Sequence, residues 1–470
     1  MKNDIKKDLD LFNLLIKDFL DEEKKVPVSQ TVAPEFMHKA IDLSLEYESL
    51  SDVEFKKSIR EILLKSPKSS SSLFFNQLYG GRHSKAVLGD LLVSFINNSM
   101  ATYKIAGVQV GIEKEIIRNV CEIIGYNNSF GGTFPTGGSM SNFMSLIMAR
   151  DRVDKKIKDH GIAENLIAYT SENTHYSVYK NASFAGIGKK NVRVVPTNTK
   201  GQMCVEALKI LIEKDLDSGC TPFYLNATAG TTVLCAFDNV EDIAKICQRN
   251  NIWLHLDGAF GGVVIFSKKH KKLIKGIEKT DSFCFNAHKT LGAPLSTSIL
   301  VVSKKKYLYN SFSNEASYLY QTHDSDYNLG QTSFECGRRN NALKFWTLWK
   351  SIGTKGLEKI VDHEFDLAKY AYDYVGSNKD YNLYSFESSL SICFNYKDYD
   401  PVDLCSQLYK NSVLMIGYGK FRKQEFIRLV TINAQNTIKE IKHFFKVLED
   451  FCEKNKHKIK KKSRCKATIL

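Results

Sequence analysis

IWLHLDGAFGG, residues 252–262, begins as a short apolar run and ends in an acid followed by small residues. Such a run, bounded by turn residues, is typical of a strand buried on both faces. Similar runs recur along the chain, and most are separated by stretches with helical periodicity. The other runs are NLIAYT (165–170), VRVVP (192–196), PFYLNAT (222–228), SFCFN (282–286) and TSILVV (297–302), and the helical stretches include 137–152, 203–215 and 239–250. This alternation predicts an α/β fold with a mostly parallel sheet, whose ligands bind at the carboxyl ends of the strands.

The regions that flank this sheet predict further parts. Residues 1–72 are polar with apolar residues at helical spacing, which predicts an N-terminal helical arm. We expect the large, ligand-binding domain over residues 73–344. A succession of helix, strand, helix, strand and helix predicts a small α+β domain over residues 345–453. Residues 454–470 form a basic tail that we expect to be disordered.

The composition is that of a soluble globular protein. Of the 470 residues, 43% are apolar and 25% are charged, and no apolar run approaches the ~18 residues of a membrane helix. The net charge is +14, of which the tail supplies +8. Eleven cysteines without a CxxC pair indicate neither a disulfide framework nor a zinc site, and favour a reducing, cytoplasmic location. We therefore expect no metal and no DNA partner.

Two charged residues stand just after predicted strands. Asp257 ends one strand, where a carboxylate could keep a pyridine nitrogen protonated. The alternative, a helix cap, fits poorly with the glycines that follow it. Lys289 follows the strand 282–286 and could form a Schiff base with an aldehyde. From this segment alone, a surface lysine at a strand-to-turn junction is equally compatible.

Two further motifs suggest contacts to a phosphorylated, flat ligand. In PTGGSMSN, residues 135–142, Gly138 and Ser139 precede a helical run. Unpaired N–H groups at a helix N-terminus bind anions, although Gly-Ser turns before helices are common. His175 follows the strand 165–170, where its ring could stack on a cofactor, although a lone histidine is more often structural.

Together these segments resemble the group II decarboxylases, which use pyridoxal phosphate and act on glutamate, cysteine sulfinate, aspartate, diaminobutyrate or aromatic amino acids. The resemblance runs from about Phe74 to Arg428 and beyond. It rests on FFNQLYGG, PTGGSMSN, TSENTHYS, YLNATAGTT, WLHLDGAFGG, DSFCFNAHK, SYLYQ and CGRR. Of these, NATAGTT and FFNQL look more like the branch that acts on acidic amino acids. The resemblance implies the type I fold of the aspartate-aminotransferase-like enzymes, and a homodimer with the site at the subunit interface.

The resemblance also implies roles for single residues. Lys289 would carry the internal aldimine, and the reaction would pass through a quinonoid. Asp257 would pair with the pyridine nitrogen, His175 would stack on the ring, and Tyr318 would protonate the substrate carbon. The other cofactor-binding residues would be Gly138, Ser139, Thr228, Ala259, Ser282, Asn286 and His288, and the substrate-binding residues Gln77, Arg428, Tyr79 and Ala101.

The substrate-binding residues give two opposed signals. Tyr79 stands where glutamate decarboxylases carry a small residue and cysteine-sulfinate decarboxylases an aromatic one, which favours a shorter acid. Ala101 stands where both carry an aromatic ring, which leaves more room. Arg339, beside Arg338, could add positive charge for a distal acid. We predict α-decarboxylation of a small acidic L-amino acid, with aspartate or cysteine sulfinate favoured over glutamate.

Two alternatives remain open from the sequence. One keeps the cofactor and changes the substrate, to diaminobutyrate or an aromatic amino acid. The other is a protein of a different class, which contacts nucleic acid or a membrane through the basic tail. Binding through the tail would fall steeply with salt, which separates this alternative from the enzymes.

Overall fold

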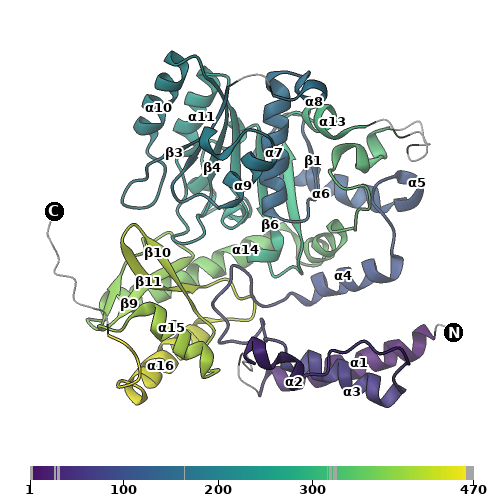
Figure 1. Ribbon diagram of the computed structural model, residues 1–470, viewed down its shortest axis with the longest axis vertical. Helices are drawn as coiled ribbons and strands as arrows, with labels where there is room; N and C mark the ends of the chain where they lie inside the picture. Colours follow the sequence, from purple (N-terminus) through teal and green to yellow (C-terminus); the bar gives the residue numbers. More distant parts are fainter. Residues whose placement is uncertain are drawn as a thin grey trace. The chain divides into compact units, whose positions relative to one another are not determined.

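Two units make up the chain in the computed structural model (Figure 1). The structure describes residues 4–25, 28, 32–162, 165–314, 316, 320 and 325–461. The small unit comprises Met1–Gly81, Tyr370–Tyr384 and Ile392–Leu470, and the large unit comprises Arg82–Lys369 and Ser385–Ser391. The division of the sequence after residues 72, 344 and 453 stays a prediction.

The large unit is built on a sheet with the strand order β1-β7-β6-β5-β4-β2-β3. From β3 to β6 the neighbouring strands run parallel, whereas β7 is antiparallel to both β6 and β1. The bounds are β1 Gly131–Thr133, β2 Leu166–Ser171, β3 Val192–Val195, β4 Thr221–Thr228, β5 Trp253–Gly258, β6 Ser282–Asn286 and β7 Ser298–Val302. The mostly parallel sheet is thus confirmed, with a strand for each apolar run. The sequence does not predict β1, because GGT carries no large apolar side chain.

Helices cover both faces of this sheet. Ala168 of β2 belongs to the hydrophobic cluster around α7 (Gly138–Val153). The hydroxyl of the next residue, Tyr169, donates to Asp215 of α10 (Val205–Asp217) at 2.8 Å. Because neighbouring residues of a strand point to opposite faces, α7 and α10 lie on opposite faces of the sheet. This covering explains why the strands are almost continuously apolar.

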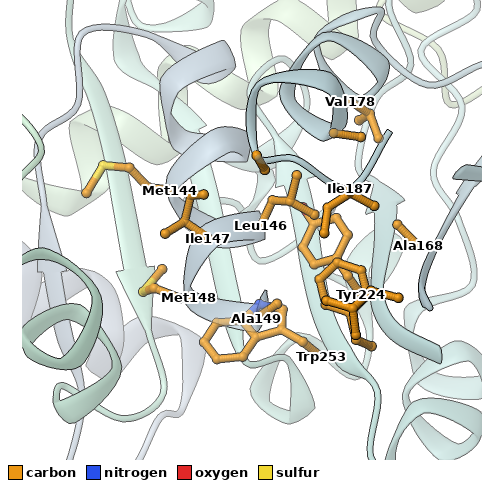
Figure 2. Packing of buried hydrophobic residues seen from close by; sticks show 14 of the residues in the cluster. Met144, Leu146, Ile147, Met148, Ala149, Ala168, Val178, Ile187, Tyr224 and Trp253 are labelled. Atoms are coloured by element: carbon orange, nitrogen blue, oxygen red, sulfur yellow. The ribbon is translucent and has the colours of Figure 1, made fainter. Parts of the chain in front are cut away.

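The cluster between α7 and the sheet holds the start of α7 in place at the sheet edge. Figure 2 shows Leu146 and Ala149 of α7 together with Tyr224 and Trp253 of the strands. All four are essentially buried, and complete burial of a large apolar side chain contributes about 1.5–3 kcal/mol. The rigid packing matters because the N-terminal turn of α7 borders the site described below.

The other helices of the large unit connect the strands or continue the chain beyond them. The predicted helices at 137–152, 203–215 and 239–250 correspond to α7, α10 and α11. The remaining bounds are α4 Ser84–Ile96, α5 Tyr103–Ala106, α6 Gln109–Ile124, α8 Ile157–His160, α9 Ser177–Phe184, α11 Val240–Arg249, α12 Ala287–Thr290, α13 Lys306–Phe312 and α14 Ala342–Ser377, with 3-10 helices η2 Lys189–Asn191, η3 Gly262–Phe266, η4 Lys271–Ile274, η5 Ile277–Lys279, η6 Ser325–Tyr327 and η7 Leu329–Thr332. The last residues of α14 belong to the small unit.

The small unit holds a second sheet, with the order β10-β11-β9-β8. Its two hairpin pairs, β8 with β9 and β10 with β11, are antiparallel. The bounds are α1 Ile5–Glu23, η1 Pro34–Phe36, α2 Met37–Ala40, α3 Asp52–Lys65, β8 Tyr381–Leu383, β9 Ser391–Tyr396, α15 Pro401–Lys410, β10 Gly417–Phe421, β11 Gln424–Val430 and α16 Ile438–Lys454. The α+β character predicted for the C-terminal part is therefore confirmed.

The chain after α16 is described as far as Lys461. The backbone N–H of Lys460 donates to Asp403 at 2.8 Å, and the Lys461 ammonium pairs with Asp398 at 2.5 Å. The rest of the basic tail, residues 462–470, lies outside the described residues. Among the helices that the structure describes, none is both long and apolar enough to cross a membrane.

Candidate active site

A cavity of about 210 Å³ opens in the large unit where β4, β5 and β6 end and α7 begins. This is the position at which parallel sheets bind ligands. The cavity brings together nine of the residues predicted from the sequence. They are Gly138, Ser139, His175, Thr228, Asp257, Ala259, Asn286, His288 and Lys289.

Asp257 lies at the end of β5 and is held by two N–H donors and, more weakly, by the Cys284 thiol, 3.8 Å from its Oδ1. Its Oδ1 accepts the backbone N–H of Ala259 at 3.0 Å, and its Oδ2 accepts from Asn142 Nδ2 at 2.7 Å. The next helical segment begins only at Gly262, so Asp257 is not a helix cap. The carboxylate is buried and fixed in orientation, with the ammonium of Lys289 in the lining of the same cavity.

His175 presents a neutral imidazole to the cavity. Its Nδ1 accepts the backbone N–H of Ser177 at 3.2 Å and lies 2.8 Å from Ser177 Oγ. Burial lowers the pKa of His175, as does Lys289 to a smaller extent, whereas Asp257 raises it. With Nδ1 accepting, the ring proton sits on Nε2. An uncharged aromatic ring in this position is suited to stacking on a flat ligand.

The start of α7 forms an anion cradle. Gly137 precedes the helix without a side-chain cap bond, and the first-turn N–H groups of a helix lack intrahelical partners. Both Gly138 and Ser139 line the cavity. A Cβ on Gly138 would come within 2.9 Å of Ala259 Cβ, so no side chain fits between the helix and the β5 loop. The glycine therefore lets a ligand reach the backbone donors directly.

Two polar side chains after β6 complete this end of the cavity. Asn286 Oδ1 accepts the Ser298 hydroxyl at 2.7 Å, which directs the amide nitrogen elsewhere. His288 Nδ1 accepts the backbone N–H of Thr297 at 2.9 Å. Burial lowers the pKa of His288 to about 4, so the ring is neutral and carries its proton on Nε2. Both side chains thus keep an N–H group for a ligand.

The lining fits pyridoxal phosphate. Thr228 Oγ1 is buried and has no hydrogen-bond partner among the described residues. A buried hydroxyl that makes no hydrogen bond costs about 1–3 kcal/mol. A ligand oxygen in the cavity would satisfy it. The anion cradle suits a phosphate, Asp257 suits a pyridine N–H, and Lys289 suits an aldehyde.

One predicted cofactor residue lies elsewhere. Ser282 is fully buried, and its Oγ lies 2.8 Å from both Ser145 Oγ and His255 Nδ1. It begins β6, whereas the cavity opens at Asn286, where β6 ends. The structure therefore does not bring the Ser282 hydroxyl to the phosphate cradle, because a strand of five residues separates them.

The predicted substrate residues are not gathered in this cavity. Ala101 is buried in the large unit, its carbonyl accepts the N–H of Gly330 at 2.8 Å, and it does not line the cavity. Tyr318 lies outside the described residues. In the small unit, Arg428 Nη2 donates to the carbonyl of Asn76, the residue before Gln77, at 3.0 Å. Burial lowers the pKa of Arg428.

Tyr79, also in the small unit, is 37% exposed, with its ring 6.1 Å from that of Phe74. The arginines of the CGRR motif serve the fold of the large unit. Arg338 is buried and pairs with Glu113 at 2.5 Å, and Arg339 pairs with Asp90 at 3.1 Å.

Sequence reasoning missed part of the lining. The additional residues are Asn142, Tyr176, Gly230, Thr232 and Phe260. Asn142 could have been found, because it stands three residues after Ser139 in a predicted helix and residues at that spacing share a helix face. Tyr176 carries no comparable signal, since it lies in a turn whose conformation the sequence does not fix.

A family model described as the pyridoxal-dependent decarboxylase conserved domain matches residues 32–397. The chain belongs to this decarboxylase family. It is 34% identical over 426 residues to the mouse (Mus musculus) acidic amino acid decarboxylase GADL1, across 86% of this chain and 77% of that protein. It is also 34% identical over 456 residues to human (Homo sapiens) cysteine sulfinic acid decarboxylase, across 91% and 92%.

The crystal structure of mouse CSAD has the same fold. It matches with a TM-score of 0.89 and 30% identity, over 94% of this chain and 97% of that chain. The predicted type I α/β fold, the carboxy-lyase class and the pyridoxal phosphate cofactor of this family member are therefore confirmed.

Proposed function

We propose that this decarboxylase releases the α-carboxylate of a small acidic L-amino acid as CO₂ and leaves the amine. Cysteine sulfinate and aspartate are the favoured substrates, ahead of glutamate. The observation that carries the proposal is the cavity of the large unit, which joins a lysine, a strand-end carboxylate and an anion cradle. The names of the relatives at 34% identity, an acidic amino acid decarboxylase and a cysteine sulfinic acid decarboxylase, support the substrate class.

The lining residues predicted from the sequence have proposed parts in holding the cofactor. Lys289 binds its aldehyde carbon, and Asp257 accepts the pyridine N–H. His175 stacks on one face of the ring and Ala259 contacts the other. The N–H groups at the start of α7 and the side chains of Ser139, Asn286 and His288 would hold the phosphate, and Thr228 would donate to a ring substituent.

The chemistry requires the chain to orient the substrate and control one proton. Bound pyridoxal phosphate supplies an electron sink for the negative charge that CO₂ leaves on Cα. Asp257 keeps the pyridine proton in place by its opposite charge. Gln77 and Arg428 are the proposed ligands of the α-carboxylate, which sets the angle of the bond to be broken. Tyr318 remains the predicted acid that protonates Cα.

We place this activity in a homodimer in the cytoplasm. An uncovered apolar face in the large unit supports the dimer. On α4, Leu88, Leu92 and Phe95 recur at helical spacing and are 49%, 43% and 54% exposed. Such a face is typical of a surface that a second subunit covers. The molar mass in solution, measured by light scattering, tests this directly.

The function is tested with a parallel substrate panel on the purified holoprotein. Cysteine sulfinate, aspartate, glutamate, 2,4-diaminobutyrate and an aromatic amino acid are each supplied, and CO₂ and the amine are both measured. We expect the highest kcat/KM with cysteine sulfinate or aspartate. A preference for diaminobutyrate or an aromatic substrate would overturn the substrate class and leave the cofactor chemistry standing. A protein that takes up no pyridoxal phosphate would overturn the site itself.

A further inference from the structure

Beneath the cavity floor, polar groups form a continuous buried chain. It begins at the indole of Trp253, whose Nε1 lies 3.0 Å from Ser282 Oγ and 3.1 Å from Ser145 Oγ. The two hydroxyls are 2.8 Å apart, and Ser282 Oγ is 2.8 Å from His255 Nδ1. All four side chains are fully buried. Polar groups in such a setting are costly unless each has a partner.

This chain of hydrogen bonds continues to the cavity, where it divides into two branches. His255 Nε2 lies 3.0 Å from Asn142 Oδ1, and Asn142 Nδ2 donates to Asp257 Oδ2 at 2.7 Å. The same amide nitrogen lies 3.2 Å from Ser177 Oγ, which in turn lies 2.8 Å from His175 Nδ1. One asparagine therefore joins the carboxylate under the cavity to the imidazole at its side.

The groups at the two ends of this hydrogen-bonded chain fix the direction in which its hydrogen bonds are donated. The Trp253 indole only donates and the Asp257 carboxylate only accepts. Asn142 Nδ2 donates to Asp257, so Asn142 Oδ1 must accept from His255 Nε2–H. In the neutral ring Nδ1 is then an acceptor, and Ser282 donates to it while accepting from the indole. The reverse arrangement would turn the Asn142 oxygen toward Asp257 and set two acceptor oxygens 2.7 Å apart.

In the branch to His175, the hydrogen bonds are donated from Asn142 toward His175. The backbone N–H of Ser177 can only donate, and it donates to His175 Nδ1 at 3.2 Å. The Ser177 hydroxyl then also points its proton at this nitrogen and accepts from Asn142. With the Ser145 hydroxyl donating to Ser282, these groups have one consistent assignment, which follows from the fixed groups at the ends. The thiol of Cys284 also lies 3.7 Å from Asn142 Oδ1 and 3.8 Å from Asp257 Oδ1.

We propose that His255 and Asn142 are positioning residues for the cofactor, and that they fix the carboxylate of Asp257 and the tautomer of His175 together. His255 touches neither cofactor nor substrate; it acts by holding the Asn142 amide in one orientation. Loss of this orientation would leave Asp257 held only at Oδ1, by the Ala259 N–H and the Cys284 thiol, and would weaken its hold on the pyridine proton. The inference rests on the roles proposed above for Asp257 and His175.

Burial favours the neutral form of the titratable groups around Asp257 other than Lys289. The titratable groups that face Asp257 are His175, His255, Lys289, Cys284 and Tyr224. Burial lowers the pKa of His255 to about 4, and burial raises the pKa of both Cys284 and Tyr224. The orientation of the carboxylate therefore depends on the Asn142 amide and not on a second charge in the chain.

Variants of His255 and a matched control on the same strand test the proposal. His255→Phe removes both ring nitrogens, whereas His255→Gln keeps one donor and one acceptor. Leu256→Ala is the control, because Leu256 is the adjacent buried residue on β5 and points to the other face of the sheet. The readouts are the apparent dissociation constant of pyridoxal phosphate for the apoprotein and the pH at which the absorbance of the bound cofactor changes.

We expect His255→Phe to weaken cofactor binding by about tenfold to a hundredfold, which corresponds to one hydrogen bond to a charged group. The midpoint of the absorbance titration should fall by about one pH unit, because a loosened carboxylate holds the pyridine proton less well. His255→Gln should restore both values to near those of the wild type. Leu256→Ala should lower the unfolding temperature and leave the titration midpoint in place.

A second variant covers the case in which His255→Phe does not fold. Asn142→Ser shortens a side chain that lines the cavity and should give the same tenfold loss and the same shift. The proposal is overturned if Asn142→Ser, or a folded His255→Phe, keeps the wild-type cofactor affinity and titration midpoint. Asp257→Asn serves as the reference: if it too leaves cofactor affinity and midpoint unchanged, the role proposed for Asp257 fails along with the inference.

Discussion

The cavity floor and the β10–β11 hairpin each carry a charged residue proposed for the reaction, and they hold it differently. Asp257 accepts from an asparagine side chain whose own partner, His255, is fixed by a further buried hydroxyl. Arg428 is also buried, but its Nη2 donates to the backbone carbonyl of Asn76, which belongs to no helix or strand. The first residue is set by a network between the sheet and α7, and the second contacts a loop.

This difference implies that cofactor binding and substrate binding depend on different residues of the molecule. The sheet fixes the position of Asp257, at the end of β5, and of Lys289, in α12 directly after β6. We therefore expect both residues to keep one role, in cofactor binding. A residue that contacts loop backbone can shift with small changes in that loop. We therefore expect substitutions on the cavity floor to change cofactor binding, and substitutions near Arg428 to change substrate binding alone.

The largest effect is expected at Lys289. Lys289→Ala should reduce turnover by roughly four orders of magnitude or more, because it removes the group proposed to bind the cofactor covalently. Borohydride reduction of the wild type should fix the cofactor to Lys289, as mapped by peptide mass spectrometry. Lys268→Ala, an exposed lysine of the same unit, should keep both properties. A reduced label on another lysine would break the assignment of the cavity.

A smaller effect, confined to the substrate, is expected at Arg428. Arg428→Lys keeps the charge but loses the planar fork that matches a carboxylate. We expect kcat/KM to fall by about a hundredfold, mainly through KM, as for a lost charge-assisted hydrogen bond. The dissociation constant of pyridoxal phosphate should not change. A parallel loss of cofactor affinity would show that the two regions are not separable in the way argued here.

The sequence predicts the cavity better than it predicts the substrate residues, for a physical reason. Apolar runs fix the strands, and strand ends at Asp257 and Asn286 must meet at one sheet edge. Gly261, one of the small residues after Asp257, is required by packing. A Cβ on Gly261 would approach a ring atom of Phe237 at 2.7 Å and the carbonyl oxygen of Ala229 at 2.8 Å, so this glycine serves packing and not the approach of a flat ring.

Buried polar networks escape prediction because their partners are distant in sequence. His255 reads as one more residue of an apolar strand, and its partners Asn142 and Ser282 lie 113 and 27 residues away. The family resemblance implies a cofactor contact for Ser282, but Ser282 stands at the opposite end of β6 from the cavity. Tertiary contact, not local pattern, decides which of these hydroxyls and amides meets a ligand.

The pH dependence of stability probes the cavity floor without any cofactor. Burial lowers the pKa of His255 from 6.5 to about 4, so between these values the unfolded chain takes up a proton that the folded chain does not. Stability contributed by the neutral ring is present above pH 6.5 and is lost as the pH falls toward 4. His255→Gln removes this pH-dependent contribution to the free energy of unfolding. The stability of the wild type relative to the variant should therefore fall by about 2 kcal/mol between pH 7 and pH 5.

Chemical unfolding of the two apoproteins at both pH values measures this difference. Leu256→Ala, on the same strand, should lose stability equally at pH 7 and pH 5, because it has no titratable group. An unchanged difference between the wild type and His255→Gln would mean that His255 takes up its proton in the folded protein at the same pH as in the unfolded chain. In that case the direction assigned to the buried chain would be wrong.

The smallest and most selective effect is expected at Tyr79. If its ring limits substrate length, Tyr79→Gly should raise the ratio of kcat/KM for glutamate to that for cysteine sulfinate by about tenfold, the value of one methylene in a pocket. Tyr79→Phe keeps the ring and should keep the ratio. Because Tyr79 is 37% exposed, the variant should unfold at nearly the wild-type temperature. An unchanged ratio would mean that Ala101, and not Tyr79, determines which substrate is accepted. Ala101 lies in the large unit with the cofactor residues. Substrate choice and cofactor binding would then belong to one region, and the contrast between the two would hold only for the α-carboxylate.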